Sequence, residues 1–269
     1  MSSTATRRSR AALLLLLAVV LPVLVTAPAR AQVNPFWDHY KVYYQNPPFV
    51  SPIPIPPVTL KDQFGQFTHQ VLQLELFMNP VVKIHPPNTY SINDSITHYA
   101  WWSINPQPQA LTVNVTNQFG DQTLNVYDGV YLLNPALKNQ TGPLPVKNHY
   151  KAYNCLGAPI NAPIGMVDQF DGWQATVLTP RWFLTPVDKQ VGQPGTGQYY
   201  PIVDPNQHYV CYEFQPPDPT PYLATMYDQF AQGVHLNLYP GRYICVPTYK
   251  LGVTGAVKDT WGRLKLLYR

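Results

Sequence analysis

The chain repeats one sequence pattern four times, and this repetition restricts its possible folds more than any other feature. Each copy opens with a His-Tyr pair, carries Asp/Asn-Gln-Phe near its middle and closes with Pro-x-x-Lys. From opening histidine to closing lysine, the four repeat units are 39–83, 98–138, 149–189 and 208–250. A fixed internal period indicates one small structural unit formed several times. Residues shared by all copies are therefore expected to be mainly structural.

Three residue types recur at equivalent positions in every unit. The opening histidines are His39, His98, His149 and His208. The central glutamines are Gln63, Gln118, Gln169 and Gln229, and the phenylalanines that follow them are Phe64, Phe119, Phe170 and Phe230. We expect each histidine to bond a nearby turn or strand end, and each Asx to bond its own backbone in a turn. The phenylalanines should fill the core, and the glutamines should satisfy buried backbone groups.

The first 31 residues have the pattern of a secretory signal sequence. Three arginines precede the apolar stretch 11–25, and the small-x-small triplet 29–31 gives a cleavage site before Gln32. The apolar stretch is short for a membrane span and no second one follows it. We therefore expect a secreted protein, extracellular or periplasmic, with no membrane span after the signal is removed.

Charge argues against nucleic acid as a partner. Four of the 18 arginine and lysine residues lie in the signal, so the remaining chain has 14 basic residues against 14 acidic ones. Binding to phosphate backbones requires a clustered excess of positive charge. We expect no nucleic-acid partner.

Proline and tyrosine content favours an all-β fold. The chain has 30 prolines, of which only Pro22 and Pro28 lie in the signal, and 19 tyrosines. Proline disrupts helix interiors, while aromatic residues suit half-buried pleated surfaces. Each unit is expected to supply about four short strands, because an alternating opening segment, a proline-rich loop, a second alternating segment and a hairpin follow one another. Clear hairpin sequences occur at 124–129 and 236–241.

The size of a unit bears on the domain organisation. A unit of roughly 40 to 45 residues is too small to bury a core alone. We expect the units to pair into two β-sandwich or barrel-like modules, 32–145 and 146–257, followed by a C-terminal tail, 258–269. A continuous four-unit assembly is the competing arrangement.

The sequence pattern of the units resembles a repeat domain of unknown function found in secreted bacterial and archaeal proteins. That repeat has the form His-Tyr-x-Cys-Tyr, then Asp-Gln-Phe-Gly, then Leu-Cys-x-Pro-x-x-Lys. Four copies of it cover residues 39–250. The resemblance implies an exported β-rich module, and it brings no activity, ligand or catalytic residue. Only unit four retains both cysteines of the pattern.

The cysteine positions predict a disulfide. Three residues after the opening histidine, and two before the closing proline, units one to three have apolar residues, whereas unit four has Cys211 and Cys245. The simplest account is that these two positions touch in every unit and that unit four joins them covalently, which suits an exported protein. Two separate buried thiols are the alternative. Cys155 remains, either as a small buried residue or in an intermolecular bridge.

No set of catalytic, cofactor-binding or metal-ligating residues is identified. No unit has two histidines at metal-ligand spacing. After the signal the chain has two glutamates, Glu75 and Glu213, and sequence alone does not bring two carboxylates together as a glycosidase requires. We expect no cofactor and no enzymatic activity, with a secreted hydrolase as a remaining alternative.

A binding or structural role at the cell surface or outside the cell is therefore expected. Aromatic residues that are not shared among units are the candidates for ligand contact, because such rings lose little entropy on docking. These candidates are Trp101, Trp102, Tyr199 and Tyr200. The partner is unknown, with a glycan or another envelope or extracellular protein as possibilities. Because glutamine beside an aromatic ring recurs in sugar-binding repeats, a lectin-like carbohydrate-binding module is the first alternative function.

Overall fold

The computed structural model describes residues 34–193 and 197–255, which form fifteen β-strands and no helix. The expected signal (1–31) and tail (258–269) lie outside the described residues. In chain order the strands are β1 (His39–Phe49), β2 (Val58–Asp62), β3 (Gly65–His69), β4 (Val71–His85), β5 (Asn88–Tyr90), β6 (His98–Gln107), β7 (Leu111–Asn117), β8 (Gly120–Lys138), β9 (His149–Leu156), β10 (Ala162–Val167), β11 (Gly172–Val191), β12 (Gln198–Tyr200), β13 (His208–Asp218), β14 (Tyr222–Tyr227) and β15 (Gln232–Gly255). The all-β prediction is confirmed.

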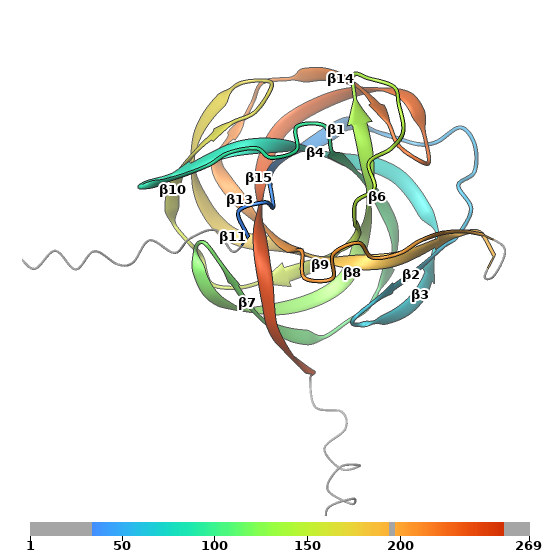
Figure 1. The fold of residues 1–269 in the computed structure, drawn as a ribbon, viewed down its shortest axis with the longest axis horizontal. Coiled ribbons are helices and arrows are strands. Elements are labelled where there is room, and N and C mark those ends of the chain that lie inside the picture. The colour runs from blue at the N-terminus through green and yellow to red at the C-terminus, as the bar shows by residue number, and fades with distance from the viewer. Residues whose placement is uncertain (1–33, 194–196, 256–269) are drawn as a thin grey trace, which may run out of the picture.

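The pairings of eight of these strands close into a ring, which Figure 1 shows from one end. The neighbours around the ring are β1, β4, β6, β8, β9, β11, β13 and β15, and β15 pairs with β1 again. Every pairing is antiparallel, and each repeat unit supplies two neighbouring strands, one opening and one closing. Closure satisfies the backbone groups that an open sheet would leave at its edges.

The register within each unit places the two predicted positions opposite each other. The facing pairs are Val42–Met78, Trp101–Leu133, Ala152–Leu184 and Cys211–Cys245. In unit four the two cysteines form a disulfide, so that prediction is confirmed. Cys155 is a buried free thiol inside an apolar cluster.

Side chains fill the interior of the ring. One buried cluster takes residues from all eight ring strands. Within it, the tyrosines that follow the opening histidines contact one another edge to face in a closed set, with ring centroids 5.5 to 5.8 Å apart. The four members of this set are Tyr40, Tyr99, Tyr150 and Tyr209. Edge-to-face contact is a favourable geometry for aromatic rings, so the ring interior is a packed core.

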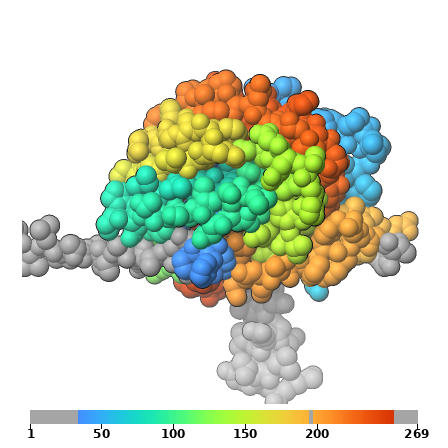
Figure 2. Space-filling view, turned by 45° about the horizontal axis from the view of Figure 1, so that its top comes forward, coloured from blue at the N-terminus to red at the C-terminus, as the bar shows by residue number. Residues whose placement is uncertain are grey.

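The middle part of each unit, here called its arm, lies outside the ring and pairs with the unit on the opposite side. β2 of unit one pairs with the end of β11 in unit three, and β10 of unit three pairs with the end of β4 in unit one. The latter pairing brings units one and three side by side on one face (Figure 2). Units two and four exchange arms in the same way, through β7 with β15 and β14 with β8.

The expected division into two modules, 32–145 and 146–257, is not confirmed. β8 and β9 pair directly across the expected boundary, and the arms of units one and two pair with units three and four. All four units also contribute to one buried cluster, so these pairings correspond to the competing arrangement, a continuous four-unit assembly.

Candidate binding site

Each opening histidine is buried at the start of a ring strand. The exposed fractions of His39, His98, His149 and His208 are 1, 2, 5 and 4%. Burial lowers the pKa of all four imidazoles, and the closing lysine of the same unit lowers it further through its positive charge. Removal from water disfavours the charged imidazolium at all four positions. The structure places the four histidines in four separate environments.

The Asx-Gln-Phe turn of one unit covers the histidine and lysine of the preceding unit. The ammonium groups of Lys83, Lys138 and Lys189 lie 4.3, 3.9 and 5.1 Å from the ring centroids of the next phenylalanines. Those rings belong to Phe119, Phe170 and Phe230. In all four turns, Phe64 included, the Asx oxygen accepts a hydrogen bond from the phenylalanine backbone N–H at 2.7 to 2.9 Å. Each turn is therefore an Asx turn.

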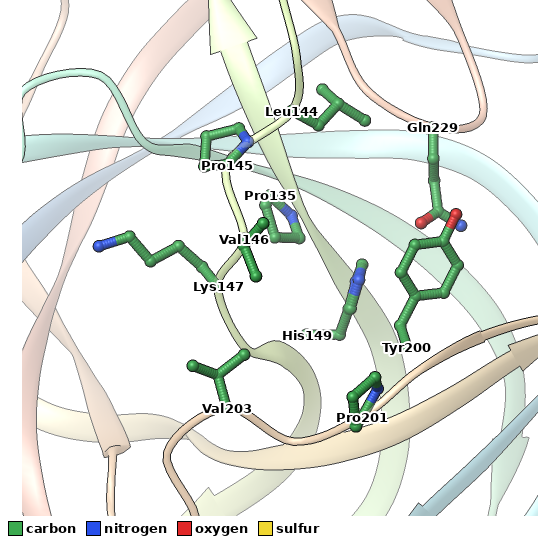
Figure 3. Close-up of a pocket in the computed structure, with 10 residues that line it drawn as sticks. All are labelled: Pro135, Leu144, Pro145, Val146, Lys147, His149, Tyr200, Pro201, Val203 and Gln229. Atoms are coloured by element: carbon green, nitrogen blue, oxygen red, sulfur yellow. The ribbon is translucent and has the colours of Figure 1, made fainter.

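The four turn glutamines differ in what they bond. Gln118 lies 3.1 Å from the His39 ring, Gln63 donates to the Thr185 hydroxyl at 3.1 Å, and Gln169 donates to the Asn79 amide oxygen at 3.3 Å. The side chain of Gln229 instead lines an open groove (Figure 3). The groove at Gln229 is the candidate binding site.

The first hollow of the groove has a volume of about 160 Å³ and an apolar lining. It lies among the end of β8, the join 139–148, the start of β9, the join 201–207 and the turn before β15 (Figure 3). Its lining residues are Pro135, Leu144, Pro145, Val146, Lys147, His149, Tyr200, Pro201, Val203 and Gln229.

A second hollow, of about 200 Å³, shares Tyr200 and Gln229 with the first. Its other lining residues come from the proline-rich loop of unit one, from β11 and β12, and from Phe230. Tyr200 and Gln229 thus form a ridge between two hollows, with an aromatic ring and an amide beside each other (Figure 3). The two hollows that share these residues are here called the Tyr200 groove.

Buried groups behind the ridge hold Tyr200 in place. The Tyr200 ring packs edge to face on His149, with centroids 5.0 Å apart, and the Lys189 ammonium lies 4.8 Å from the Tyr200 centroid. Asn134 accepts hydrogen bonds from Lys189 Nζ at 2.7 Å and His149 Nδ1 at 3.2 Å. The amide of Asn134 donates to the buried carboxylate of Asp228 at 3.1 Å. This network fixes the wall of the groove from inside.

The rim of the first hollow is also anchored. The Lys147 ammonium lies 2.9 Å from the Asp94 carboxylate. The side chain of Asn148 accepts hydrogen bonds from the backbone N–H groups of Val203 and Asp204 at 2.8 and 2.9 Å. The two joins that border this hollow are therefore tied to each other and to the join between units one and two.

The aromatic candidates divide into two kinds. Trp101 and Trp102 are fully buried. Trp101 packs inside the ring on Trp182, and the Trp102 indole N–H donates to Asp228 at 2.7 Å, so neither presents a surface to a ligand. Their assignment as ligand residues is corrected for that reason. Tyr200 lies in the groove, while Tyr199 is 58% exposed and is not among its lining residues.

Sequence reasoning missed most of the groove. Pro135, Val146, Lys147 and Val203 line it without belonging to any recognisable binding motif. The available signal was the position of the two joins, because both lie between units and loops of this kind carry function more often than repeated strands do. Sequence does not show that ring closure brings these two joins together.

The described residues were also compared with the requirements of a metal site and of a membrane-spanning helix, and they meet neither. Among residues 34–193 and 197–255, no group of three or more histidine, cysteine, aspartate or glutamate side chains is placed to hold a metal ion. The same residues contain no helix that is long and apolar enough to cross a bilayer.

The fold defines the class: an all-β repeat protein whose units exchange arms around a closed ring. The chain belongs to the family described as a repeat of unknown function (DUF7450), which matches residues 98–247, more than half of the chain. The match begins at the opening histidine of unit two and ends at the closing proline of unit four. No curated protein and no solved structure matches the chain.

Proposed function

We propose that this protein is a non-catalytic, secreted binding protein and that the Tyr200 groove holds a carbohydrate chain. The observation that carries the proposal is the ridge of Tyr200 and Gln229 between two hollows. A pyranose ring presents an apolar C–H face and polar hydroxyl edges, so it requires an aromatic or apolar wall beside a hydrogen-bonding amide. Two adjoining hollows suit two successive sugar rings.

The carboxylates of the chain support binding without hydrolysis. None of the described residues that line either hollow is an aspartate or glutamate. Glu75 accepts hydrogen bonds from Gln73 and Tyr131, and Glu213 is engaged by Arg242. Glycoside hydrolysis requires two carboxyl groups facing one bond, and the groove does not supply them.

A location outside the cell is supported by two features. The Cys211–Cys245 disulfide is of the kind that persists in oxidising compartments. The arginine-containing n-region and apolar stretch at the N-terminus have the pattern of an export signal. Fractionation of cells that express the full chain tests this part of the proposal, since retention in the cytoplasm would contradict it.

The test of binding is a glycan array probed with the chain from Gln32 onward, followed by calorimetry on the best ligand. We expect saturable binding that Tyr200→Ala weakens by about tenfold or more, equivalent to the loss of one stacked ring. Tyr199→Ala is the matched control, because Tyr199 is adjacent, exposed and outside the groove. Turnover of a glycan would show an enzyme instead, and no saturable binding would leave a purely structural role.

A further inference from the structure

In units one and two, the opening histidine Nδ1 and the closing lysine Nζ are buried without a hydrogen-bond partner: His39 with Lys83, and His98 with Lys138. Around Lys83 a third buried atom also lacks a partner, so that His39 Nδ1, Lys83 Nζ and Gln118 Nε2 form one neighbourhood. Buried polar groups are nearly always hydrogen-bonded in native proteins. Several orphaned atoms around one lysine therefore point to a ligand that the protein itself does not provide.

The neighbourhood is closed by aromatic rings. Lys83 is fully buried, with its ammonium 4.3 Å from the Phe119 centroid and 5.1 Å from the Tyr90 centroid. The rings of His39 and Tyr90 lie 5.0 Å apart, and Gln118 contacts the far nitrogen of His39. Lys83 and His39 are thus buried together beside Tyr90.

The equivalent site in unit three has a hydrogen-bond acceptor that the unit-one site lacks. There Asn134 accepts from both Lys189 Nζ and His149 Nδ1. Leu133 pairs with Tyr150, and in the same register Cys245 pairs with Tyr40, so residue 246 stands where residue 134 does. Residue 246 is a valine, whose side chain has no hydrogen-bond acceptor.

The negative charge of the unit-three site is missing as well. Asp228, the first residue of the covering turn, favours the charged form of Lys189. Its counterpart over unit one is Asn117, which is uncharged. Burial lowers the pKa of Lys83, and no carboxylate opposes that shift. An uncompensated buried ammonium either loses its proton or binds an anion.

We propose that a small monovalent anion of halide size binds between Lys83 Nζ and His39 Nδ1, beside Val246. The anion takes the place of the Asn134 amide oxygen as the common acceptor and of Asp228 as the negative charge. His39 can donate a hydrogen bond to the anion when Nδ1 carries the proton. Its Nε2 then accepts a hydrogen bond from the Gln118 amide, which requires the flipped orientation of that amide. The site is closed and structural, separate from the Tyr200 groove.

Thermal unfolding in different sodium salts at one ionic strength tests the proposal. An anion that binds only the folded protein stabilises it by mass action, so chloride or bromide in place of gluconate should raise the melting temperature by about 2 to 4 °C. In crystals grown with bromide, an anomalous peak should lie within hydrogen-bond distance of Lys83 Nζ. Equal melting temperatures and no peak would show a neutral lysine solvated by water, which overturns the proposal.

Two variants make the test specific. Val246→Asn supplies the acceptor that unit three has, and it should abolish the halide response. Lys83→Met removes the ammonium and should also abolish it, which provides a second test if Val246→Asn does not fold. Lys189→Met is the matched control, because the proposed anion lies in unit one and the halide response should remain. A response that persists in Lys83→Met would place the anion elsewhere and overturn the assignment.

Discussion

The sites of units one and three share their frame and differ in their chemistry. In both, a buried histidine lies under a tyrosine ring, with centroids 5.0 Å apart, and a buried lysine faces that tyrosine. Tyr90 is 7% exposed and closes the unit-one site, whereas Tyr200 is partly exposed on the ridge of an open groove. The same frame therefore supports one closed site and one open site.

The difference depends on residues outside the repeated pattern. Asn134 and Asp228 satisfy the lysine and histidine of unit three internally. Val246 and Asn117 occupy the corresponding positions over unit one. The repeated His, Gln-Phe and Lys residues set the geometry, while single changes at neighbouring positions decide whether a site is self-sufficient or requires a ligand.

Lowering the pH should have the largest effect on the unfolding free energy, because it protonates the buried opening histidines that all the units share. Burial holds the pKa of His98 at about 3 and that of His208 at about 4. In the unfolded chain the same histidines bind protons near pH 6.5. The unfolding free energy is therefore fully retained above pH 6.5, and it falls as the pH drops from 6.5 toward the pKa values of the folded protein. At pH 4 each of the two should cost about 3 kcal/mol of unfolding free energy.

Urea unfolding between pH 7.5 and pH 4 measures this loss. The control is His235→Asn, which alters an exposed histidine outside the four buried sites and should leave the profile unchanged. A flat profile would mean that the repeated histidines are not buried as neutral groups, and the shared frame would lose its basis.

Asn134→Val should convert the unit-three site toward the unit-one site. It leaves Lys189 Nζ and His149 Nδ1 without their common acceptor, and we expect a loss of about 3 kcal/mol of unfolding free energy. The reciprocal Val246→Asn should not cost as much, because it adds an acceptor where donors are unpaired. Chemical denaturation of both variants in a halide-free buffer measures the difference, and equal losses would contradict the distinction between the sites.

Tyr90→Ala and Tyr200→Ala should distinguish the tyrosine that closes the unit-one site from the tyrosine that contacts the ligand in the Tyr200 groove. Tyr90 is almost fully buried, so its removal opens a cavity and should cost about 3 kcal/mol, whereas the partly exposed Tyr200 should cost about 1 kcal/mol. Urea midpoints measure both. Only Tyr200→Ala should weaken glycan binding, and a loss of binding in Tyr90→Ala at temperatures where it is folded would argue that the groove is elsewhere.

Sequence reasoning succeeded where contacts lie within one unit. The pairing of Cys211 with Cys245 follows from comparing four copies, because two strands of one unit face each other in the ring. It failed for contacts between units. The exchange of β2 and β10 between opposite units depends on ring closure, which leaves no local pattern. For the same reason Trp102, whose indole bonds a carboxylate from unit four, looked like a ligand residue.

The smallest effect should come from the two glutamines that cover the sites. Gln118 contacts the His39 ring at 3.1 Å, so Gln118→Ala leaves a buried ring nitrogen unpaired and should cost about 1 kcal/mol. Gln229→Ala removes an amide at the open ridge and should stay within about 0.5 kcal/mol of the parent. Its effect should be on the ligand: weaker glycan binding in calorimetry with unchanged unfolding. If Gln229→Ala instead destabilised the protein as much as Gln118→Ala, the Tyr200 groove would be a second closed scaffold site, and the ligand would have to be sought on another face.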